Sequence, residues 1–399
     1  MKIEKIRIKN YKALQNVEIR DLPNMCVFLG ANGTGKTTLF DVFGFLSDSL
    51  KNNVKTSLNK RGGYNEVLSR DCTGDIEFEI KFRNDSVDGK KQPLITYELS
   101  IGLKNNQPIV TKEILSYRRG QTGKPYKFLD FSDGIGNAII NEDEFEIAKQ
   151  EFKEKREEQK LDSPDILALK GLGQFQKFKA ISSFRKLLDN WYVSNFQIQA
   201  AQTITDTGVS EHLSTNGNNL AQVTKYIYEN FPENFQSILK KMQQRIPGVS
   251  KVEATETIDG RIVLQIQDGT FKDPFISRYV SDGTIKMFAY LILLNDPQPF
   301  PLLCVEEPEN FLHPEILVEL AEEFRDYSLR GGQVFISSHS PDFVNALNIE
   351  ELFWLSKEKG YSKIIRAKDD PILVKLINEG DLLGSLWKQN YLKGSGPRA

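Results

Sequence analysis

Residues 25–46, MCVFLGANGTGKTTLFDVFGFL, contain the pattern that decides the fold. The apolar run at 25–29 predicts a buried strand, and the apolar spacing after Lys36 predicts a helix. Between them, Gly30 to Thr37 fits GxxxxGK[ST], a phosphate-binding loop that joins a strand to a helix. The alternative, a tight glycine turn before a helix, leaves the Lys-Thr pair in register unexplained. The segment therefore predicts a P-loop in an α/β fold.

The residue types of this loop suit a nucleotide polyphosphate and its metal ion. Glycines let the backbone wrap round phosphates, whose charge is met by amide N–H groups at the helix N-terminus. Lys36 is expected to reach the β and γ phosphates, and the Thr37 hydroxyl to join the magnesium shell. We therefore predict ATP and Mg²⁺ as cofactors, with the nucleotide bound by Gly30, Ala31, Asn32, Gly33, Thr34, Gly35, Lys36, Thr37 and Thr38.

A pair of acids follows a second apolar strand far along the chain. The run 301–310, PLLCVEEPEN, changes abruptly from apolar residues to Glu306 and Glu307, as a Walker B segment does. We expect Glu306 to hold magnesium or its water, although Asp is the usual residue there, and Glu307 to deprotonate the attacking water. The alternative is a buried strand that ends in two solvated acids.

Two further segments of the last third suit a nucleotide site. In 279–296, YVSDGTIKMFAYLILLND, Ser281, Asp282 and Gly283 precede an apolar helix that Ser or Asp would cap. In 331–347, GGQVFISSHSPDFVNAL, His339 follows an apolar strand, where an imidazole can sense the γ phosphate. A capped core helix and a structural histidine are the alternatives.

Composition limits the class of protein but not its partners. The 399 residues are 39% hydrophobic and 27% charged, as in a globular protein. Because no apolar run is long enough to cross a membrane, we expect a cytoplasmic protein with no membrane partner. The net charge of −2 leaves DNA contact to a local basic patch. The three cysteines fit neither a disulfide framework nor a metal site, and Cys26 and Cys304 are expected in the core.

Hydrophobic periodicity gives a coarse map of the elements. Strands are expected at 2–9, 16–20 and 25–29 and, in an antiparallel lobe, between 75 and 117. Helical patterns occupy 141–160, 176–192 and 218–246, and strands return at 251–258 and 260–267. We predict three parts: the N-terminal part of an ATPase head with the β lobe (1–135), a mainly helical insertion (136–250), and the C-terminal part of the head (251–399).

The order of the motifs favours one class of ATPase. Lys36 and Glu306 lie near opposite ends of the chain, so the nucleotide domain is split in sequence. The chain resembles the SMC/RecF/ABC-type ATPases, and among them the bacterial AAA proteins related to the overcoming-lysogenization-defect and abortive-infection ATPases. The segments that carry the resemblance are IKNYKAL (8–14), GANGTGKTT (30–38), RGG (61–63), NGNNLAQV (216–223), SDGTIKM (281–287), VEEPENFLHPE (305–315) and SSHSPDFVNAL (337–347).

This resemblance implies an ABC/SMC-head-like fold with a mixed sheet. It also implies that two copies of the chain assemble. Two subunits would hold ATP between them as a homodimer, with Ser281 and Gly283 acting on the partner's nucleotide. Pro308, Glu309 and Asn310 would begin the D-loop. Lys12 and Arg61 are extra candidates for phosphate contact, or surface cations. No glutamine is assigned to a Q-loop.

The resemblance also implies a setting. Residues 369–394 resemble the end of a subgroup of RecF-like ATPases, so we expect a complete chain without a Toprim nuclease. A nuclease or other effector would be a separate partner, in DNA surveillance, repair or anti-phage defence. Two other functions stay open: a scaffold that binds ATP with negligible hydrolysis and sequesters an effector, and a P-loop kinase or GTPase.

Overall fold

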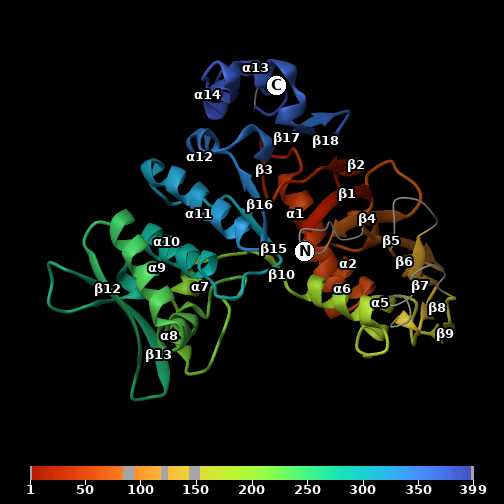
Figure 1. Ribbon diagram of the computed structural model, residues 1–399, viewed down its shortest axis with the longest axis horizontal. Helices are drawn as coiled ribbons and strands as arrows, with labels where there is room; N and C mark the ends of the chain where they lie inside the picture. The colour runs from red at the N-terminus through yellow and green to blue at the C-terminus, as the bar shows by residue number, and fades with distance from the viewer. Residues whose placement is uncertain (1, 84–93, 118–124, 143–152, 397–399) are drawn as a thin grey trace. The chain divides into compact units, whose positions relative to one another are not determined.

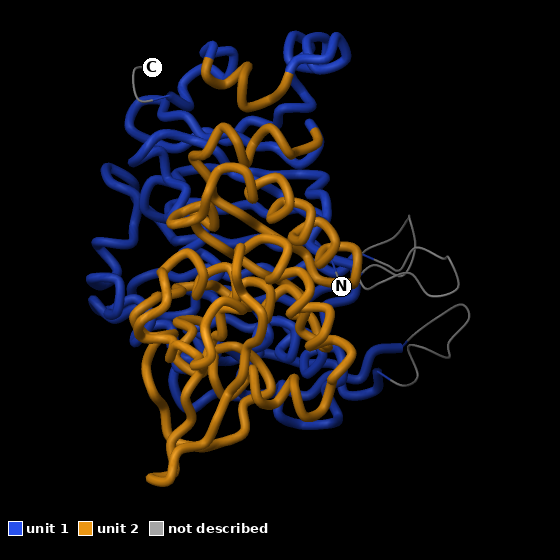
Figure 2. Tube along the Cα trace, turned by 90° about the vertical axis from the view of Figure 1, so that its left-hand side faces the viewer, with its two compact units in different colours: residues 1–191, 349–381, 389–399 blue, residues 192–348, 382–388 orange. Residues whose placement is uncertain are grey.

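The computed structural model describes residues 2–83, 94–117, 125–142 and 153–396. The chain divides into two compact units, each built from separate segments of the sequence (Figure 2). Unit 1 comprises residues 1–191, 349–381 and 389–399, and unit 2 comprises residues 192–348 and 382–388. The first and last parts of the chain thus fold together in unit 1.

An antiparallel sheet of eight strands forms the lobe that the sequence predicts in the first part of unit 1. Along β1, Ile3, Ile6 and Ile8 are buried, because alternate side chains of a strand face the core. The strands run in the order β2 (Leu14–Arg20), β1 (Lys2–Tyr11), β4 (Ile76–Arg83), β5 (Ile95–Lys104), β6 (Gln107–Tyr117), β7 (Tyr126–Ser132), β8 (Ile135–Ile139) and β9 (Arg156–Lys160).

Strand β9 corrects the helix expected over 141–160. Residues 143–152 of that segment lie outside the described residues, but Arg156–Lys160 pairs with β8 in antiparallel register. Its charged side chains alternate between exposed and partly buried positions at the end of the sheet. Glu and Lys favour helices by propensity, and pairing with β8 overrides that preference here.

A second set of strands in unit 1 joins segments from the two ends of the chain. Strand β3 (Met25–Leu29) is buried throughout and runs parallel to β17 (Leu352–Glu358), which pairs antiparallel with β18 (Tyr361–Arg366). The strands therefore form the mixed arrangement expected of this fold. Figure 1 shows the β17–β18 hairpin beside β3 and β2.

The helices of unit 1 follow the P-loop strand and the lobe. Phe28 of β3 packs edge-on against Phe40 of the first helix and stacks on Phe353 of β17, with ring centroids 6.1 and 5.4 Å apart. These aromatic contacts fix the helix on the strands. The helices are α1 (Lys36–Lys51), α2 (Val54–Asn59), α3 (Tyr64–Val67), α5 (Ala168–Leu172), α6 (Lys179–Asp189) and α13 (Pro371–Asn378).

Unit 2 is organised round one fully buried helix. Every residue of α10 (Asp282–Leu294) from Thr284 onward is buried, as expected of a helix that is apolar on all sides. Strands β15 (Leu302–Glu306) and β16 (Gln333–Ser338) pair in parallel. The other helices are α7 (Ile198–Ala201), α8 (Leu220–Asn230), α9 (Pro232–Arg245), α11 (Leu317–Leu329), α12 (Pro341–Asn345) and α14 (Leu383–Lys388).

A small separate sheet completes unit 2. Its strands β12 (Val249–Glu256) and β13 (Arg261–Asp268) confirm the strands expected at 251–258 and 260–267. The short strands β11 (Thr205–Asp206) and β14 (Phe275–Ile276) pair with β13, and β10 (Trp191–Val193) lies where the first long segment of unit 1 ends.

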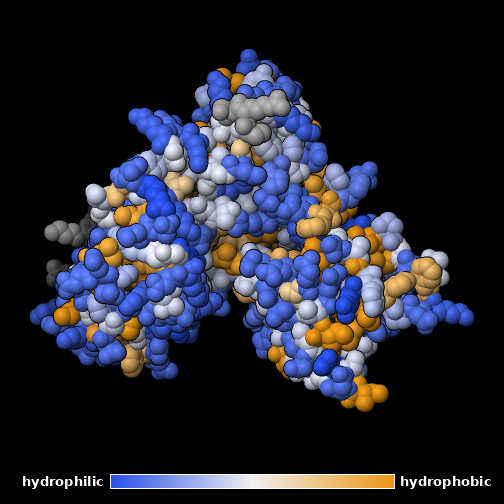
Figure 3. All heavy atoms as spheres, turned by 180° about the vertical axis from the view of Figure 1, so that it is seen from behind, coloured by the Kyte–Doolittle hydropathy of each residue, from blue (hydrophilic) through white to orange (hydrophobic). Residues whose placement is uncertain are grey.

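Hydrophilic residues cover most of the face seen in Figure 3, and the two cysteines expected in the core are buried. These are Cys26 and Cys304, as the sequence predicts, and neither forms a disulfide with a described residue. In the part of the chain that the structure describes, no helix is long and apolar enough to cross a membrane.

Candidate nucleotide site

In the P-loop of unit 1, backbone carbonyls accept hydrogen bonds from the loop's own lysine, Lys36. The ammonium of Lys36 is buried and donates to the carbonyls of Gly30 and, at 3.3 Å, Ala31. Thr34 donates through Oγ1 to the Ala31 carbonyl at 2.8 Å, which fixes the loop from inside. Gly35 precedes α1 and provides no side-chain cap. Its φ of 104° lies in the left-handed region, which residues with a side chain disfavour. The loop therefore presents backbone N–H groups at a helix N-terminus, where anions bind.

The β17–β18 hairpin supports this loop from outside. Ser362 donates from its hydroxyl to the Thr34 carbonyl at 2.6 Å, and its N–H donates to the Ala13 carbonyl at 2.8 Å. A Cβ at Gly35 would lie 2.2 Å from Ser362 Oγ, so the hairpin and the loop approach closely. The sequence analysis missed Ser362, and the serine stands in no motif that could have identified it.

Lys12 and Arg61, the two extra candidates for phosphate contact, bind a carboxylate of helix α1 instead. Lys12 Nζ lies 2.6 Å from Asp41, and Arg61 reaches Asp41 at 2.7 Å and Asp48 at 2.9 Å. Burial alone would raise the pKa of Asp41, but the hydrogen bond from Lys12 and the charge of Arg61 lower it below its usual value. In this structure, the two cations therefore neutralise carboxylates of helix α1.

In unit 2, the acid pair stands where a strand ends. Glu306 closes β15 opposite Ser337 of β16, and Glu307 follows in the left-handed region with φ 47°. A non-glycine residue there stores strain, which is frequent at functional sites. The carboxylate of Glu307 lies 3.1 Å from His339 Nδ1 and accepts from Asn310 Nδ2 at 2.9 Å. The structure thus brings the predicted base and the predicted switch histidine together.

Glu309, predicted in the D-loop, is used inside unit 2. Its buried carboxylate accepts from the hydroxyl of Ser338 and the N–H of His339, both at 2.8 Å. These two bonds fix the end of β16, where His339 begins its turn toward Glu307. The sequence identified the acid but did not distinguish it from its neighbours by role.

The predicted signature segment lies against the loop that follows the acid pair. Ser281 caps α10, accepting from the N–H of Thr284 at 3.3 Å, which confirms the expected cap. Asp282 opens the helix. Gly283 is required by close approach, since a Cβ there would lie 2.6 Å from the Phe311 carbonyl oxygen.

A buried lysine, also missed by the sequence analysis, joins the same two segments. Lys286 of α10 donates to the carbonyls of Glu307 at 3.2 Å and Asn310 at 2.9 Å, and its ammonium lies over the ring of Phe311. Burial lowers the pKa of Lys286 to about 8, although the charges of Glu309 and Glu307 oppose the shift. The backbone of the strained Glu307 is thereby fixed to the signature helix.

Within each unit, the predicted residues are therefore close to one another. Unit 1 contains the whole P-loop from Gly30 to Thr38. Unit 2 contains the signature segment, the acid pair and His339, with direct contacts that join the acid to the histidine and the signature helix to the loop after the acid. Unit 1 thus has a P-loop between a strand and a helix, and unit 2 has an acid pair at the end of a strand; these features define a P-loop ATPase fold.

The particular family follows from comparison with known proteins. A family model described as "AAA domain, putative AbiEii toxin, Type IV TA system" matches residues 25–345. The chain belongs to this family of AAA ATPases, which confirms the SMC/ABC-type relationship inferred from the motifs. None of the curated proteins compared with the chain matches it significantly.

One solved structure supports the fold, and two further ones are less similar. A structure described as the SmcHead bound to the C-winged helix domain of ScpA is 14% identical with a TM-score of 0.55, over 92% of this chain and 97% of that one. An Smc head with an extended coiled coil, bound to the C-terminal domain of ScpA from Pyrococcus furiosus, is 13% identical with a TM-score of 0.49, over 94% and 98%. The SMC head of Thermotoga maritima is 12% identical with a TM-score of 0.45, over 92% and 99%. At such identity, the first of these shows the fold alone.

Proposed function

We propose that the chain binds and hydrolyses ATP as an ABC/SMC-type ATPase and acts as a nucleotide-switched dimer. The observation that carries the proposal is the constraint on Glu307. Its strained backbone, its contact with the imidazole of His339 and its hydrogen bond from Asn310 direct one carboxylate of a strand-end acid pair. A general base must be oriented as well as charged, and these contacts orient it.

The remaining residues have complementary roles in this proposal. The P-loop N–H groups and Lys36 bind the β and γ phosphates, Glu307 takes a proton from the attacking water, and His339 contacts the γ phosphate. Lys36 already points into the loop, where it donates to carbonyls that a phosphate would replace. The charge that develops on the phosphoryl oxygens would thus meet fixed donors.

Magnesium fits the donor set. Thr37 of α1 and Glu306 at the end of β15 offer hard oxygen atoms, and these two residues would hold the ion. Among the described residues, no group of three or more His, Cys, Asp or Glu could hold a metal by itself. When bound, Mg²⁺ neutralises part of the phosphate charge.

Dimerisation is supported by the surface beside the signature segment. Tyr279 and Phe311 are 73% and 67% exposed, although large aromatic side chains are usually buried. Tyr279 precedes Ser281 by two residues, and the Phe311 carbonyl lies against Gly283. We infer that this surface meets the P-loop of a second copy, so that Ser281, Asp282 and Gly283 contact the partner's ATP.

The output of such a switch is conformational. We place the protein in the cytoplasm, in DNA surveillance, repair or anti-phage defence, with a separate nuclease or other effector as partner and DNA as a candidate ligand. The family description, which names an AbiEii toxin, supports the defence setting.

ATP turnover tests the proposal. Wild type, Lys36→Ala and Glu307→Gln would be assayed with and without double-stranded DNA, with dimerisation measured by light scattering in the same samples. We expect both variants to lose hydrolysis and Glu307→Gln to accumulate ATP-dependent dimers. Tight ATP binding with no turnover in wild type under either condition would instead establish the scaffold. Phosphate transfer from ATP to an acceptor, or preference for GTP, would support a kinase or GTPase.

A further inference from the structure

The β17–β18 hairpin turns one face toward the P-loop. Lys357 of β17 and Ser362 of β18 stand directly opposite each other in the antiparallel register. Side chains of opposite residues lie on the same face of such a pair. Because Ser362 donates to the Thr34 carbonyl, this is the face toward the P-loop, and Lys357 shares it.

The ammonium of Lys357 lies beside the turn of the P-loop. A Cβ added at Gly33 would lie 4.0 Å from Lys357 Nζ. Apart from the chain neighbours of Gly33, no other heavy atom of the described residues lies within 4 Å of that position. Those neighbours aside, the ammonium of Lys357 is therefore the one group of the described residues that borders the space next to Gly33.

Lys357 has no internal partner for that charge. It is exposed, and within the described ranges its side chain makes no hydrogen bond or ion pair. Lys363, on the opposite face of the same hairpin, contrasts with it, because its Nζ lies 3.4 Å from Glu358. A cation left unpaired beside a phosphate-binding loop is suited to a ligand's charge.

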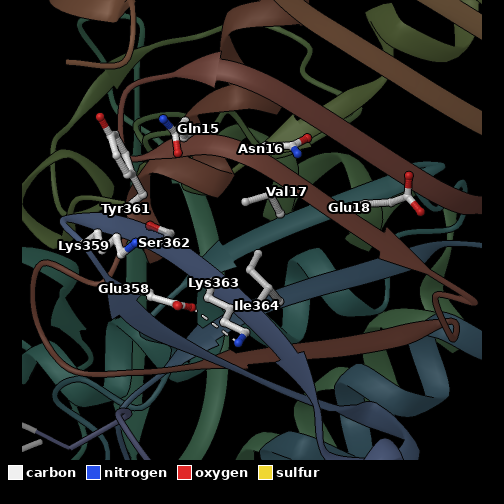
Figure 4. A pocket seen from close by; sticks show the side chains of 10 residues that line it. All are labelled: Gln15, Asn16, Val17, Glu18, Glu358, Lys359, Tyr361, Ser362, Lys363 and Ile364. Carbon is white, nitrogen blue, oxygen red and sulfur yellow. Dashed lines mark hydrogen bonds and ion pairs between the residues drawn. The ribbon is translucent and has the colours of Figure 1, made fainter. Parts of the chain in front are cut away.

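The cavity between the hairpin and β2 does not compete for this role. Figure 4 shows a pocket of about 500 Å³ between the hairpin and β2, with the Glu358–Lys363 pair inside it. Glu18 and Lys359 also line this pocket, so its acidic and basic groups balance. The unbalanced cation is the one that faces the P-loop.

We propose that Lys357 is a second phosphate-contacting lysine of the nucleotide site, supplied by the last part of the chain. The inference rests on the proposed function, since it assigns a residue to the same ATP. The glycine-rich backbone collects the phosphates near Gly33, and a lysine binds phosphate as a point charge on a flexible stem. From β17, the ammonium would contact a β or γ phosphate oxygen while Lys36 contacts the phosphates from inside the loop.

Equilibrium titration with Mg²⁺-ATP and with Mg²⁺-ADP tests this assignment. The proteins are the full chain as wild type, Lys357→Met, Lys357→Arg and the matched control Lys363→Met. The control removes the same charge from the opposite face of the hairpin. We expect Lys357→Met to lose about tenfold in ATP affinity, the equivalent of about 1.4 kcal/mol, while Lys357→Arg and Lys363→Met stay within about twofold of wild type.

The outcomes separate this inference from the function on which it rests. A greater loss for ATP than for ADP would place the contact at the γ phosphate, and equal losses at the β phosphate. ATP binding by Lys357→Met with wild-type affinity, or an equal loss in Lys363→Met, would overturn the inference. Lys36→Ala is titrated beside these variants, and if it abolishes ATP binding while Lys357→Met does not weaken it, the proposed nucleotide site stands without Lys357. A wild type that binds no nucleotide overturns both.

Discussion

Replacement of Ser362 by alanine tests whether the C-terminal hairpin maintains the P-loop in its binding conformation. The hydroxyl of Ser362 donates to the Thr34 carbonyl at 2.6 Å, and both residues are at least nine-tenths buried. Without the hydroxyl, the Thr34 carbonyl loses this donor in a buried position. An unsatisfied buried polar group costs about 1 to 3 kcal/mol.

That energy predicts the size of the effect on ATP binding. If the variant loop relaxes when empty and must be ordered again by ATP, up to the same 1 to 3 kcal/mol is lost from binding, or about 5- to 150-fold in affinity. We expect Ser362→Ala to weaken ATP binding within this range and to lower the thermal midpoint of the nucleotide-free protein. Saturating ATP should recover part of the lost midpoint.

The measurements are ATP titration by calorimetry and thermal unfolding with and without ATP. Ser356→Ala is the control, because Ser356 is buried on the other face of the hairpin, near Gly394, and not toward the P-loop. Wild-type ATP affinity in Ser362→Ala would show that the hairpin does not organise the loop. Equal losses in both variants would assign the effect to general destabilisation of the hairpin.

Three further predictions concern residues outside the P-loop. Burial raises the pKa of Glu113 to about 7 from 4.5, so the folded state retains a proton that the unfolded state releases between these values. Stability should therefore fall by about 3 kcal/mol as pH rises from about 4.5 to 7, a fall absent in Glu113→Gln when the two proteins are compared by urea unfolding. Lys286→Met removes donors to two carbonyls of the loop after the acid pair, and we expect about tenfold slower ATP turnover with ATP affinity retained; unchanged turnover would contradict this positioning role. Gly283→Ala should destabilise by about 1 to 3 kcal/mol and slow turnover, because its Cβ would lie 2.6 Å from the Phe311 carbonyl oxygen, and a wild-type melting curve would refute this.

Local signals in the sequence account for what was predicted well. The strand, glycine loop and helix at 25–46 are coded by neighbouring residues, and the cap at Ser281 needs only the N–H of Thr284. The end of β15 at Glu306 likewise follows from an abrupt change of polarity. Such features depend on short-range chemistry, so one sequence suffices to identify them.

Features that depend on distant pairing were not accessible. Ser362 and Lys357 acquire their positions only because β17 pairs with β3, and no local pattern announces that register. Lys286 looked like one more residue of an apolar helix, yet its partners are carbonyls that lie beyond the strand β15. The charged segment at 156–160 has the composition of a helix, but strand β8 offers it a ladder of hydrogen bonds.

The pairing of β3 with β17 also has a consequence for biosynthesis. The ribosome makes Val27 early and its partner Leu352 late. Roughly 325 residues separate them, and at roughly 5 to 20 residues per second their synthesis takes about 16 to 65 s. During that interval, the edge of β3 that later pairs with β17 is unpaired, and unpaired apolar edges promote aggregation. The nascent chain is therefore expected to need chaperone protection until residues 352–366 emerge, and the P-loop gains the support of the hairpin only then.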